Sequence, residues 1–245
     1  MQPSFLELSG DRPLAYHLSE GKSPTVVFLG GFRSDMTGTK AVALEAFCRK
    51  RGQRFLRFDY TGHGQSSGDF IHGTIGDWKR DVIDMLDRVV KNECILVGSS
   101  MGGWLMLLAA LERKEQVRGL VGIASAPDFT QTIEPELNAA QKREFAENGV
   151  IYIPDCYGDT PFAITQKLID DGNRHLLLHQ PIPLDIPVRL IHGVKDADVP
   201  WQVSQKLLEC LVSKDVTLTL IKEGNHRISK DDELNIIFQN VRSII

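Results

Sequence analysis

The five-residue segment Gly98-Ser99-Ser100-Met101-Gly102 restricts the possible architecture of this chain most strongly. An apolar run at 94–97 precedes it, and a long helix-forming run at 103–111 follows it. A Gly-x-Ser-x-Gly core between a strand and a helix is typical of a strained turn that exposes a serine Oγ at the end of a parallel sheet. Only Ser100 has the required spacing to both glycines, so we predict it as a nucleophile. A Cβ at either glycine is expected to collide with the neighbouring strand or helix.

A glycine-rich turn between a strand and a helix can also bind phosphate. That function requires further glycines or a Lys-Ser/Thr pair where the helix begins, and neither is present here. The pattern therefore favours a nucleophilic serine, provided that a base and an acid follow along the chain.

Strand-like and helix-like segments alternate along most of the chain, which is typical of a mostly parallel twisted sheet with helices on both faces. We predict strands at 25–29, 54–58, 94–97, 119–124, 187–191 and 216–221. Helices are predicted at 40–50, 74–90, 103–111, 201–211 and 231–241. Segments 5–8 and 14–18 are expected to form an antiparallel hairpin at the sheet edge.

The segment from about residue 126 to residue 186 interrupts this alternation. It is longer than one helical crossover and contains its own helix-forming stretches near 135–148 and 162–171. We predict a small helical cap, inserted before the strand that precedes the acid loop. Residues 1–245 are thus predicted to form a single α/β domain with an embedded cap, a length that suits one large buried core.

A base is needed to activate Ser100, and the chain offers seven histidines. His226 follows the predicted strand 216–221, and the loops after parallel strands meet at one end of a sheet. We therefore predict His226 as the base. The main rival, His63, is expected instead in a tight, glycine-shaped loop packed near the nucleophile. His192 is expected to order its own loop through hydrogen bonds.

An acid must orient the base. Asp196 is predicted for this role, because it lies at the turn after a parallel strand, where a carboxylate reaches the distal nitrogen of His226. Asp198 is the second candidate, and Asp128, after the preceding strand, is the third. The order Ser100, Asp196, His226 is the one expected for hydrolases of this architecture.

The negative charge that develops on a substrate oxygen needs two hydrogen-bond donors. The backbone N–H of Met101 is one candidate, since it lies at a helix N-terminus, where the dipole also favours negative charge. The backbone N–H of Phe32 is the other, because Gly30 and Gly31 let the loop after strand 25–29 approach closely. We predict these two groups as the oxyanion hole.

Composition excludes several other classes of protein. The net charge is −4, from 28 basic and 32 acidic residues, and no long run of one sign suggests nucleic acid as a partner. The four cysteines include no Cys-x-x-Cys pair, so they predict neither a disulfide framework nor a metal site. His175 and His179 lack the Glu of a His-Glu-x-x-His motif, so they predict no metal site either. No cofactor is predicted. The first residues resemble neither a signal nor a transit peptide, and no window is apolar enough for a membrane helix, so we predict a cytoplasmic location.

Five stretches resemble the α/β-hydrolase superfamily, and together they extend the resemblance over essentially the whole chain: 28–32, 58–68, 98–102, 192–200 and 224–227. A closer resemblance is to the mitochondrial palmitoyl-protein thioesterases, also called mycophenolic acid acyl-glucuronide esterases. It is carried by 38–41, 57–60, 97–106 and 196–201. This resemblance implies an α/β-hydrolase fold and hydrolysis of acyl esters or thioesters through Ser100, Asp196 and His226. The implied partner is a small-molecule ester or thioester, or an S-acylated protein.

Substrate contacts are predicted at Gly31, Arg33, Trp104, Phe129 and Tyr152. Arg33 follows the oxyanion glycines, where its charge can bind a substrate carboxylate or simply face solvent. Apolar residues of the cap can line an acyl pocket or pack the cap onto the body. The sequence predicts no particular oligomeric state or acyl length, and no preference between ester and thioester.

Other functions remain open on the same fold. A carbon–carbon bond hydrolase or a cofactor-free peroxidase uses the same three residue types. A dehalogenase is disfavoured, because it requires Asp where this chain has Ser100. A ligand-binding receptor without turnover is a further alternative, although the complete set of predicted catalytic residues argues against it.

Overall fold

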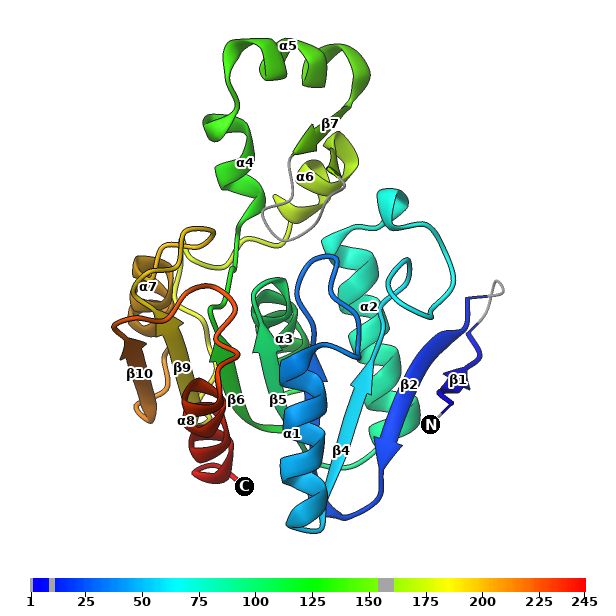
Figure 1. The fold of residues 1–245 in the computed structure, drawn as a ribbon, viewed down its shortest axis with the longest axis vertical. Helices are drawn as coiled ribbons and strands as arrows, with labels where there is room; N and C mark the ends of the chain where they lie inside the picture. The colour runs from blue at the N-terminus through cyan, green and yellow to red at the C-terminus, as the bar shows by residue number, and fades with distance from the viewer. Residues whose placement is uncertain (1, 9–11, 154–160) are drawn as a thin grey trace.

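An eight-stranded sheet forms the centre of the computed structural model, which describes residues 2–8, 12–153 and 161–245 (Figure 1). Its order is β1-β2-β4-β3-β5-β6-β9-β10. The strands pair in parallel from β4 to β10, whereas β1 and β2 are antiparallel at one edge. The predicted α/β-hydrolase sheet and its edge hairpin are confirmed. The strands are β1 (Ser4–Leu6), β2 (Leu14–Ser19), β3 (Lys22–Leu29), β4 (Gln53–Phe58), β5 (Cys94–Ser99), β6 (Val117–Ile123), β9 (Val188–Gly193) and β10 (Val216–Ile221).

Helices cover both faces of this sheet. One face packs against α1 (Thr39–Lys50) and α8 (Asp231–Arg242), and the other packs against α2 (Ile75–Met85), α3 (Met101–Glu112) and α7 (Gln202–Cys210). Side chains of β3 alternate between the two cores, because successive residues of a strand point to opposite faces. Both faces are therefore buried, which explains why the central strands are continuous apolar runs in the sequence.

The helix predicted at 74–90 is present, with a change of geometry near its end. Thr74 caps α2, and its Oγ1 accepts a hydrogen bond from the Asp77 N–H at 3.1 Å. Beyond Met85 the helix widens into a π-helical turn, η2 (Leu86–Val90), which ends at Lys91 in a left-handed conformation. A short 3₁₀ turn, η1 (Phe70–His72), precedes α2.

The segment between β6 and β9 forms a separate layer above the body (Figure 1). Its prediction is partly wrong. The helix predicted near 135–148 is present from residue 139 to residue 148, and it begins where the Asn138 side chain accepts hydrogen bonds from the Ala140 and Gln141 N–H groups. Residues 135 and 136 instead end a preceding helix that the sequence did not predict. The first residues of the helix predicted at 162–171 instead form a strand, because they pair with an antiparallel partner. The elements are α4 (Thr130–Glu136), α5 (Ala139–Asn148), β7 (Val150–Ile153), β8 (Phe162–Thr165) and α6 (Gln166–Gly172).

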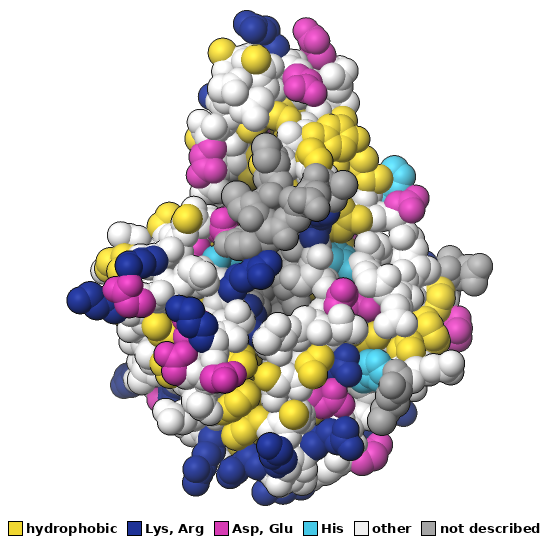
Figure 2. Space-filling model, in the orientation of Figure 1, with side chains coloured by type: hydrophobic (Ala, Val, Ile, Leu, Met, Phe, Trp, Pro, Cys, Tyr) yellow, Lys and Arg dark blue, Asp and Glu magenta, His cyan; other side chains and the backbone are white. Residues whose placement is uncertain are grey.

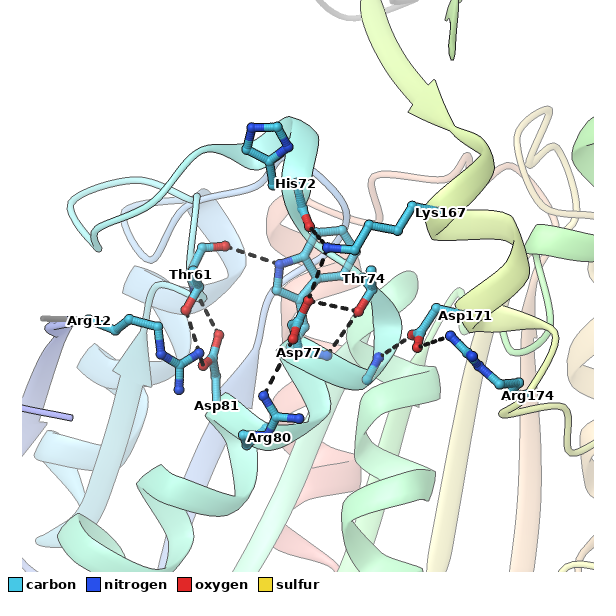
Figure 3. A network of polar contacts seen from close by, with 12 residues as sticks. Arg12, Thr61, His72, Thr74, Asp77, Arg80, Asp81, Lys167, Asp171 and Arg174 are labelled. Carbon is cyan, nitrogen blue, oxygen red and sulfur yellow. Dashed lines mark hydrogen bonds and ion pairs between the residues drawn. The ribbon is translucent and has the colours of Figure 1, made fainter. Parts of the chain in front are cut away.

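Polar contacts attach α6 to the start of α2 (Figure 3). The Asp171 carboxylate accepts a hydrogen bond of 2.7 Å from the Gly76 N–H. First-turn N–H groups have no partner within their helix and favour negative charge, so this carboxylate satisfies one of them. Lys167 Nζ donates to the His72 carbonyl at 2.7 Å and lies 4.0 Å from Asp77. The cap elements are thereby tied to the side of the body that carries α2.

The surface carries both signs of charge. In the view of Figure 2, basic and acidic side chains are interspersed over the body, and hydrophobic side chains are exposed on both the cap and the body. Tyr152 of β7 is one of the exposed large hydrophobic residues. None of the helices in the described ranges is both long enough and apolar enough to cross a membrane.

Candidate active site

Ser100 lies in the tight turn between β5 and α3. Its φ of 56° and ψ of −121° place it in a strained region that non-glycine residues rarely occupy. A Cβ built on Gly98 would lie 2.3 Å from the Gly102 carbonyl oxygen, and one built on Gly102 would lie 2.1 Å from the Leu29 carbonyl oxygen. The collisions predicted for the two glycines are confirmed. The turn therefore requires glycine on both sides of the strained serine.

Ser100, His226 and Asp196 form a continuous hydrogen-bonded chain. His226 Nε2 lies 3.0 Å from Ser100 Oγ, and His226 Nδ1 lies 2.7 Å from Asp196 Oδ2. With its proton on Nδ1, the imidazole donates to the carboxylate and accepts from the serine hydroxyl. The loops after β9 and β10 carry Asp196 and His226 to the turn after β5, as the sequence predicts for the carboxyl ends of parallel strands.

The environment of Asp196 keeps its carboxylate ionised. Burial raises the pKa of the Asp196 carboxyl. Hydrogen bonds from His192, His226 and the Val199 N–H, together with the charge of His226, lower this pKa by more than burial raises it. The net effect holds the pKa of Asp196 well below its ordinary value. The second oxygen, Oδ1, accepts the N–H groups of Asp198 and Val199 at 2.9 and 2.8 Å. A fixed negative charge therefore faces His226 Nδ1.

The loop after β3 lies against the turn that carries Ser100. A Cβ built on Gly31 would lie 3.3 Å from Ser100 Cβ, so the backbone there approaches Ser100 closely. The next residue is Phe32, and Arg33 adopts a φ of 59° that turns the loop back. On the other side, Met101 begins α3, where N–H groups lack helical partners. The two predicted oxyanion donors thus belong to segments that meet at Ser100.

The His63 side chain accepts a hydrogen bond from the loop after β3. Its Nε2 accepts a hydrogen bond from the Arg33 N–H at 3.3 Å, and its Nδ1 donates to the Thr61 carbonyl at 3.3 Å. Burial lowers the pKa of His63 to about 4, although the hydrogen bond to Thr61 opposes this effect. The ring is therefore neutral at pH 7, and its lone pair is free to accept the Arg33 N–H. His63 lies in the predicted glycine-shaped loop, with Gly62 and Gly64 in left-handed conformations.

The other acid candidates lie in different surroundings. Asp128 accepts the N–H groups of Leu177 and Leu178 at 2.8–3.0 Å, and so ties the start of the inserted segment to its return. Burial raises the pKa of Asp128, and these two hydrogen bonds oppose the rise. Asp198 is exposed. Ligand atoms of Asp196, Asp198 and His226 lie within 4.8 Å of one another, but the first and last already bond to each other, which suits proton handling more than metal binding.

An aromatic cluster surrounds the Phe32 ring. Four rings contact it edge-on, with centroids 4.8–5.8 Å away, and they come from both the body and the cap: Phe70, Trp78, Phe129 and Phe162. Edge-on aromatic pairs stabilise beyond the area that they bury. The position of the loop that carries Phe32, a predicted oxyanion donor, therefore depends on packing against the cap as well as against α2.

The residues predicted to contact substrate lie in different surroundings. The guanidinium of Arg33 lies 5.5 Å from the centre of the Phe162 ring, over its face. Trp104 is fully buried, donates from Nε1 to the His175 carbonyl at 3.1 Å, and packs against Phe129. Tyr152 is 55% exposed on β7. Contact of these residues with substrate stays a prediction.

A pocket of about 260 Å³ opens at the base of the cap. Its lining comes from the start of the inserted segment, from α4 and from the chain that returns to β9: Asp128, Gln131, Leu176, Leu178 and His179. Leu176 and Leu178 pack against the main core, so the apolar part of this pocket is continuous with it.

Lys40 is a residue near the site that the sequence did not single out. Its Nζ donates to the carbonyl of Arg227, the residue after His226. Burial lowers the pKa of Lys40 to about 8, and the charge of Arg227 lowers it further, whereas Glu233 and Asp196 raise it. A lysine in the first turn of a helix is ordinarily solvated, so no sequence pattern distinguishes this one.

The fold and the site together define a serine hydrolase of the α/β-hydrolase class. The family described as serine aminopeptidase, S33 matches residues 22–148. The mitochondrial palmitoyl-protein thioesterase ABHD10 of Mus musculus is 42% identical over 243 residues, which cover 99% of this chain and 82% of that protein. The chain belongs to this family of thioesterases, as its closer sequence resemblance predicted.

Two solved structures extend the similarity to the backbone. Alpha/beta hydrolase domain-containing protein 10 from mouse superimposes with a TM-score of 0.92 at 41% identity, covering 99% of this chain and 98% of the mouse chain. A putative hydrolase from Agrobacterium vitis S4 gives a TM-score of 0.94 at 38% identity, with 99% and 97% coverage. The ABHD10 relatives are named mitochondrial, whereas the sequence predicted a cytoplasmic location, which stays a prediction for this chain.

Proposed function

We propose that Ser100 is the nucleophile, His226 the general base and Asp196 the acid of a catalytic triad. One observation carries this assignment: the hydrogen-bonded chain from Ser100 Oγ through both nitrogens of His226 to a buried carboxylate. Such a chain lets the imidazole take the serine proton while the carboxylate stabilises the resulting cation. We further propose that the catalytic body and the insertion at about 126–186 form one domain, with the insertion as its cap.

The first half of the reaction forms an acyl-enzyme. Ser100 Oγ attacks the carbonyl carbon of an ester or thioester while its proton passes to His226 Nε2. The carbonyl oxygen becomes an oxyanion, and the N–H groups of Met101 and Phe32 donate to it. Loss of one such donor typically costs about 3–4 kcal/mol of transition-state stabilisation. Collapse of the tetrahedral intermediate breaks the bond to the leaving group, which takes the proton from His226.

The second half restores the enzyme. Water donates a proton to His226 Nε2 and attacks the acyl carbon, and the same two N–H groups stabilise the second oxyanion. Collapse then breaks the bond to Ser100 Oγ, which regains its proton from His226. The products are a carboxylic acid and the free alcohol or thiol. Every proton in this scheme moves through His226, so the cycle uses only residues of this chain and water.

The proposed substrate is a protein cysteine that carries a long acyl chain. The support is the name of the ABHD10 relatives, palmitoyl-protein thioesterases, together with a similarity that extends over 99% of the chain and so includes the cap. The apolar surroundings of Phe32 add support, because cap rings from Phe129 and Phe162 contact the side chain of this predicted oxyanion donor. A small-molecule thioester of the same acyl group is expected to react by the same steps.

The test is a burst experiment with p-nitrophenyl esters and thioesters of graded acyl length. Wild type is expected to release one equivalent of leaving group before steady state, and Ser100→Ala is expected to release none. Ser99→Ala is the matched control, since the neighbouring serine fails the spacing and is expected to keep the burst. A burst in Ser100→Ala would refute the assignment of the nucleophile. The absence of turnover with every ester and thioester would refute the proposed reaction.

A further inference from the structure

A second histidine contacts the predicted acid of the triad. His192, at the end of β9, is fully buried, and its Nε2 lies 3.1 Å from Asp196 Oδ2 and 2.9 Å from the Val199 carbonyl oxygen. On the other side of the ring, Nδ1 lies 2.7 Å from Oγ of Ser204, a buried residue of α7. Asp196 Oδ2 is the same oxygen that accepts the proton of His226 Nδ1.

The partners determine which nitrogen of His192 carries a proton. Both atoms near Nε2 are oxygens that can only accept, so Nε2 must carry the hydrogen and share it between them. Nδ1 is then the lone-pair side of a neutral ring and accepts the hydroxyl proton of Ser204. Ser204 thus holds one end of the ring, while the other end donates to Asp196.

Two histidine N–H groups therefore compete for one carboxylate oxygen. A donor from His192 draws electron density away from the side of Asp196 that faces His226, and it also limits rotation of the carboxylate. The charged groups near this pair include Lys40 from α1, Asp198 from the same loop, and Arg227 and Glu233, whose charges act on Lys40. Lys40 donates to the Arg227 carbonyl in the loop of His226, and the Asp198 N–H donates to the other carboxylate oxygen, Oδ1.

We propose that His192 is a positioning residue, which holds Asp196 in the orientation that His226 requires and limits how strongly Asp196 favours a protonated His226. The inference rests on the proposed triad. Without the His192 donor, more of the carboxylate's charge acts on His226, so the base stays protonated to higher pH. The carboxylate also gains freedom to rotate away from Nδ1. Both effects lower the fraction of enzyme that is ready to accept the serine proton.

Two amide substitutions separate the two ends of the His192 ring. In His192→Gln, the side-chain nitrogen occupies the position of Nε2 and can still donate to Asp196. In His192→Asn, the shorter side chain reaches only the position of Nδ1, so it keeps a group beside Ser204 and loses the donor to Asp196. Ser204→Ala is the matched control, because it removes the hydrogen bond at the far end and leaves the Nε2 donor in place.

The measurement is log(kcat/KM) against pH for a p-nitrophenyl ester, with thermal unfolding of each variant. For His192→Asn we expect kcat/KM to fall about tenfold, in keeping with loss of a hydrogen bond to a charged group. The acid limb, which reports protonation of the free enzyme's base, is expected to move up by about half to one pH unit, as such a loss implies. His192→Gln is expected to keep the wild-type acid limb. Ser204→Ala is expected to lower the unfolding temperature without moving the limb.

Rates of labelling by a serine-directed fluorophosphonate, followed against pH, are expected to show the same ordering. They provide a readout for variants with slow turnover. The proposal is overturned if His192→Asn keeps the wild-type limb, or if Ser204→Ala moves the limb as far as His192→Asn does. Equal losses in the Gln and Asn variants without a shift would assign His192 a purely structural role. A burst in Ser100→Ala would instead overturn the triad itself, so the two failures are distinguishable.

Discussion

Replacement of His63 by leucine is expected to damage the predicted oxyanion hole without touching the triad. His63 accepts the Arg33 N–H in the residue next to the Phe32 donor. Leaving that N–H without a partner costs about 1–3 kcal/mol where it is shielded from water. Displacement of the loop weakens donation from Phe32, a loss of up to about 3–4 kcal/mol in the transition state. We therefore expect kcat for p-nitrophenyl esters to fall by about tenfold to several hundredfold, at similar KM, since the lost interaction belongs to the transition state.

The same substitution is expected to change how stability depends on pH. Burial lowers the pKa of His63 from 6.5 to about 4, so in this interval the unfolded chain binds the proton more readily than the folded chain. Wild type should therefore lose stability as pH falls from about 6.5 to about 4. This pKa difference is worth at most about 3 kcal/mol. His63→Leu lacks the titrating group, so its urea-unfolding free energy should fall less over this range.

The control for both measurements is His72→Leu, because the His72 side chain is exposed and the hydrogen bonds to Lys167 and Asp69 use the His72 backbone. This variant should keep the wild-type kcat and the wild-type acid dependence of unfolding. Wild-type kcat in His63→Leu would refute the idea that this ring supports the oxyanion loop. An unchanged loss of stability between pH 6.5 and 4 would refute the assignment of that loss to His63.

Three further predictions concern the frame around the site. Asp171→Asn removes the charge from the hydrogen bond to the Gly76 N–H. This change should lower the free energy of unfolding by about 1 kcal/mol and should speed proteolysis of the cap. An unchanged cleavage rate would contradict this prediction. Gly102→Ala places a Cβ 2.1 Å from the Leu29 carbonyl oxygen, so soluble expression or the burst should be lost, and wild-type activity would show that the turn adapts. The pKa of Lys40 is lowered from 10.5 to about 8, so the unfolded chain binds more protons between these values. Wild-type stability relative to Lys40→Met should therefore rise with pH over this interval, as urea unfolding at pH 7.5–10.5 can measure.

The sheet and the candidate catalytic residues could be predicted from the sequence, because short local patterns mark both. Buried parallel strands appear as short apolar runs, and the glycines at 98 and 102 mark a turn that no Cβ can enter. Parallel topology then brings the ends of β5, β9 and β10 to one edge, which is why the chain order of Ser100, Asp196 and His226 sufficed to predict their meeting. The role of each remains a proposal that the burst experiment tests.

The cap was predicted less well, because its elements depend on contacts between distant residues. Three of the four residues at 162–165 are types that favour strands, but so short a segment shows no period that separates strand from helix, and it becomes β8 by pairing with β7. The attachment of α6 through Asp171 also depends on a partner, Gly76, that lies 95 residues earlier in the chain. A single charged residue on a helix surface is ordinarily solvated, so nothing in the sequence marks this one as structural.

The three histidines around Ser100 show why residue type alone does not determine catalytic role. His63 and His192 are buried and have both nitrogens occupied by partners of the fold, so neither can exchange a proton with substrate without breaking a contact that holds the site. His226 is the one of the three whose hydrogen bonds join a fixed carboxylate to the serine hydroxyl, which is itself the reacting group. The same ring can therefore support a loop, orient an acid or transfer a proton. The partner of its second nitrogen decides among these roles: a backbone N–H for His63, the Ser204 hydroxyl for His192, and the nucleophile for His226.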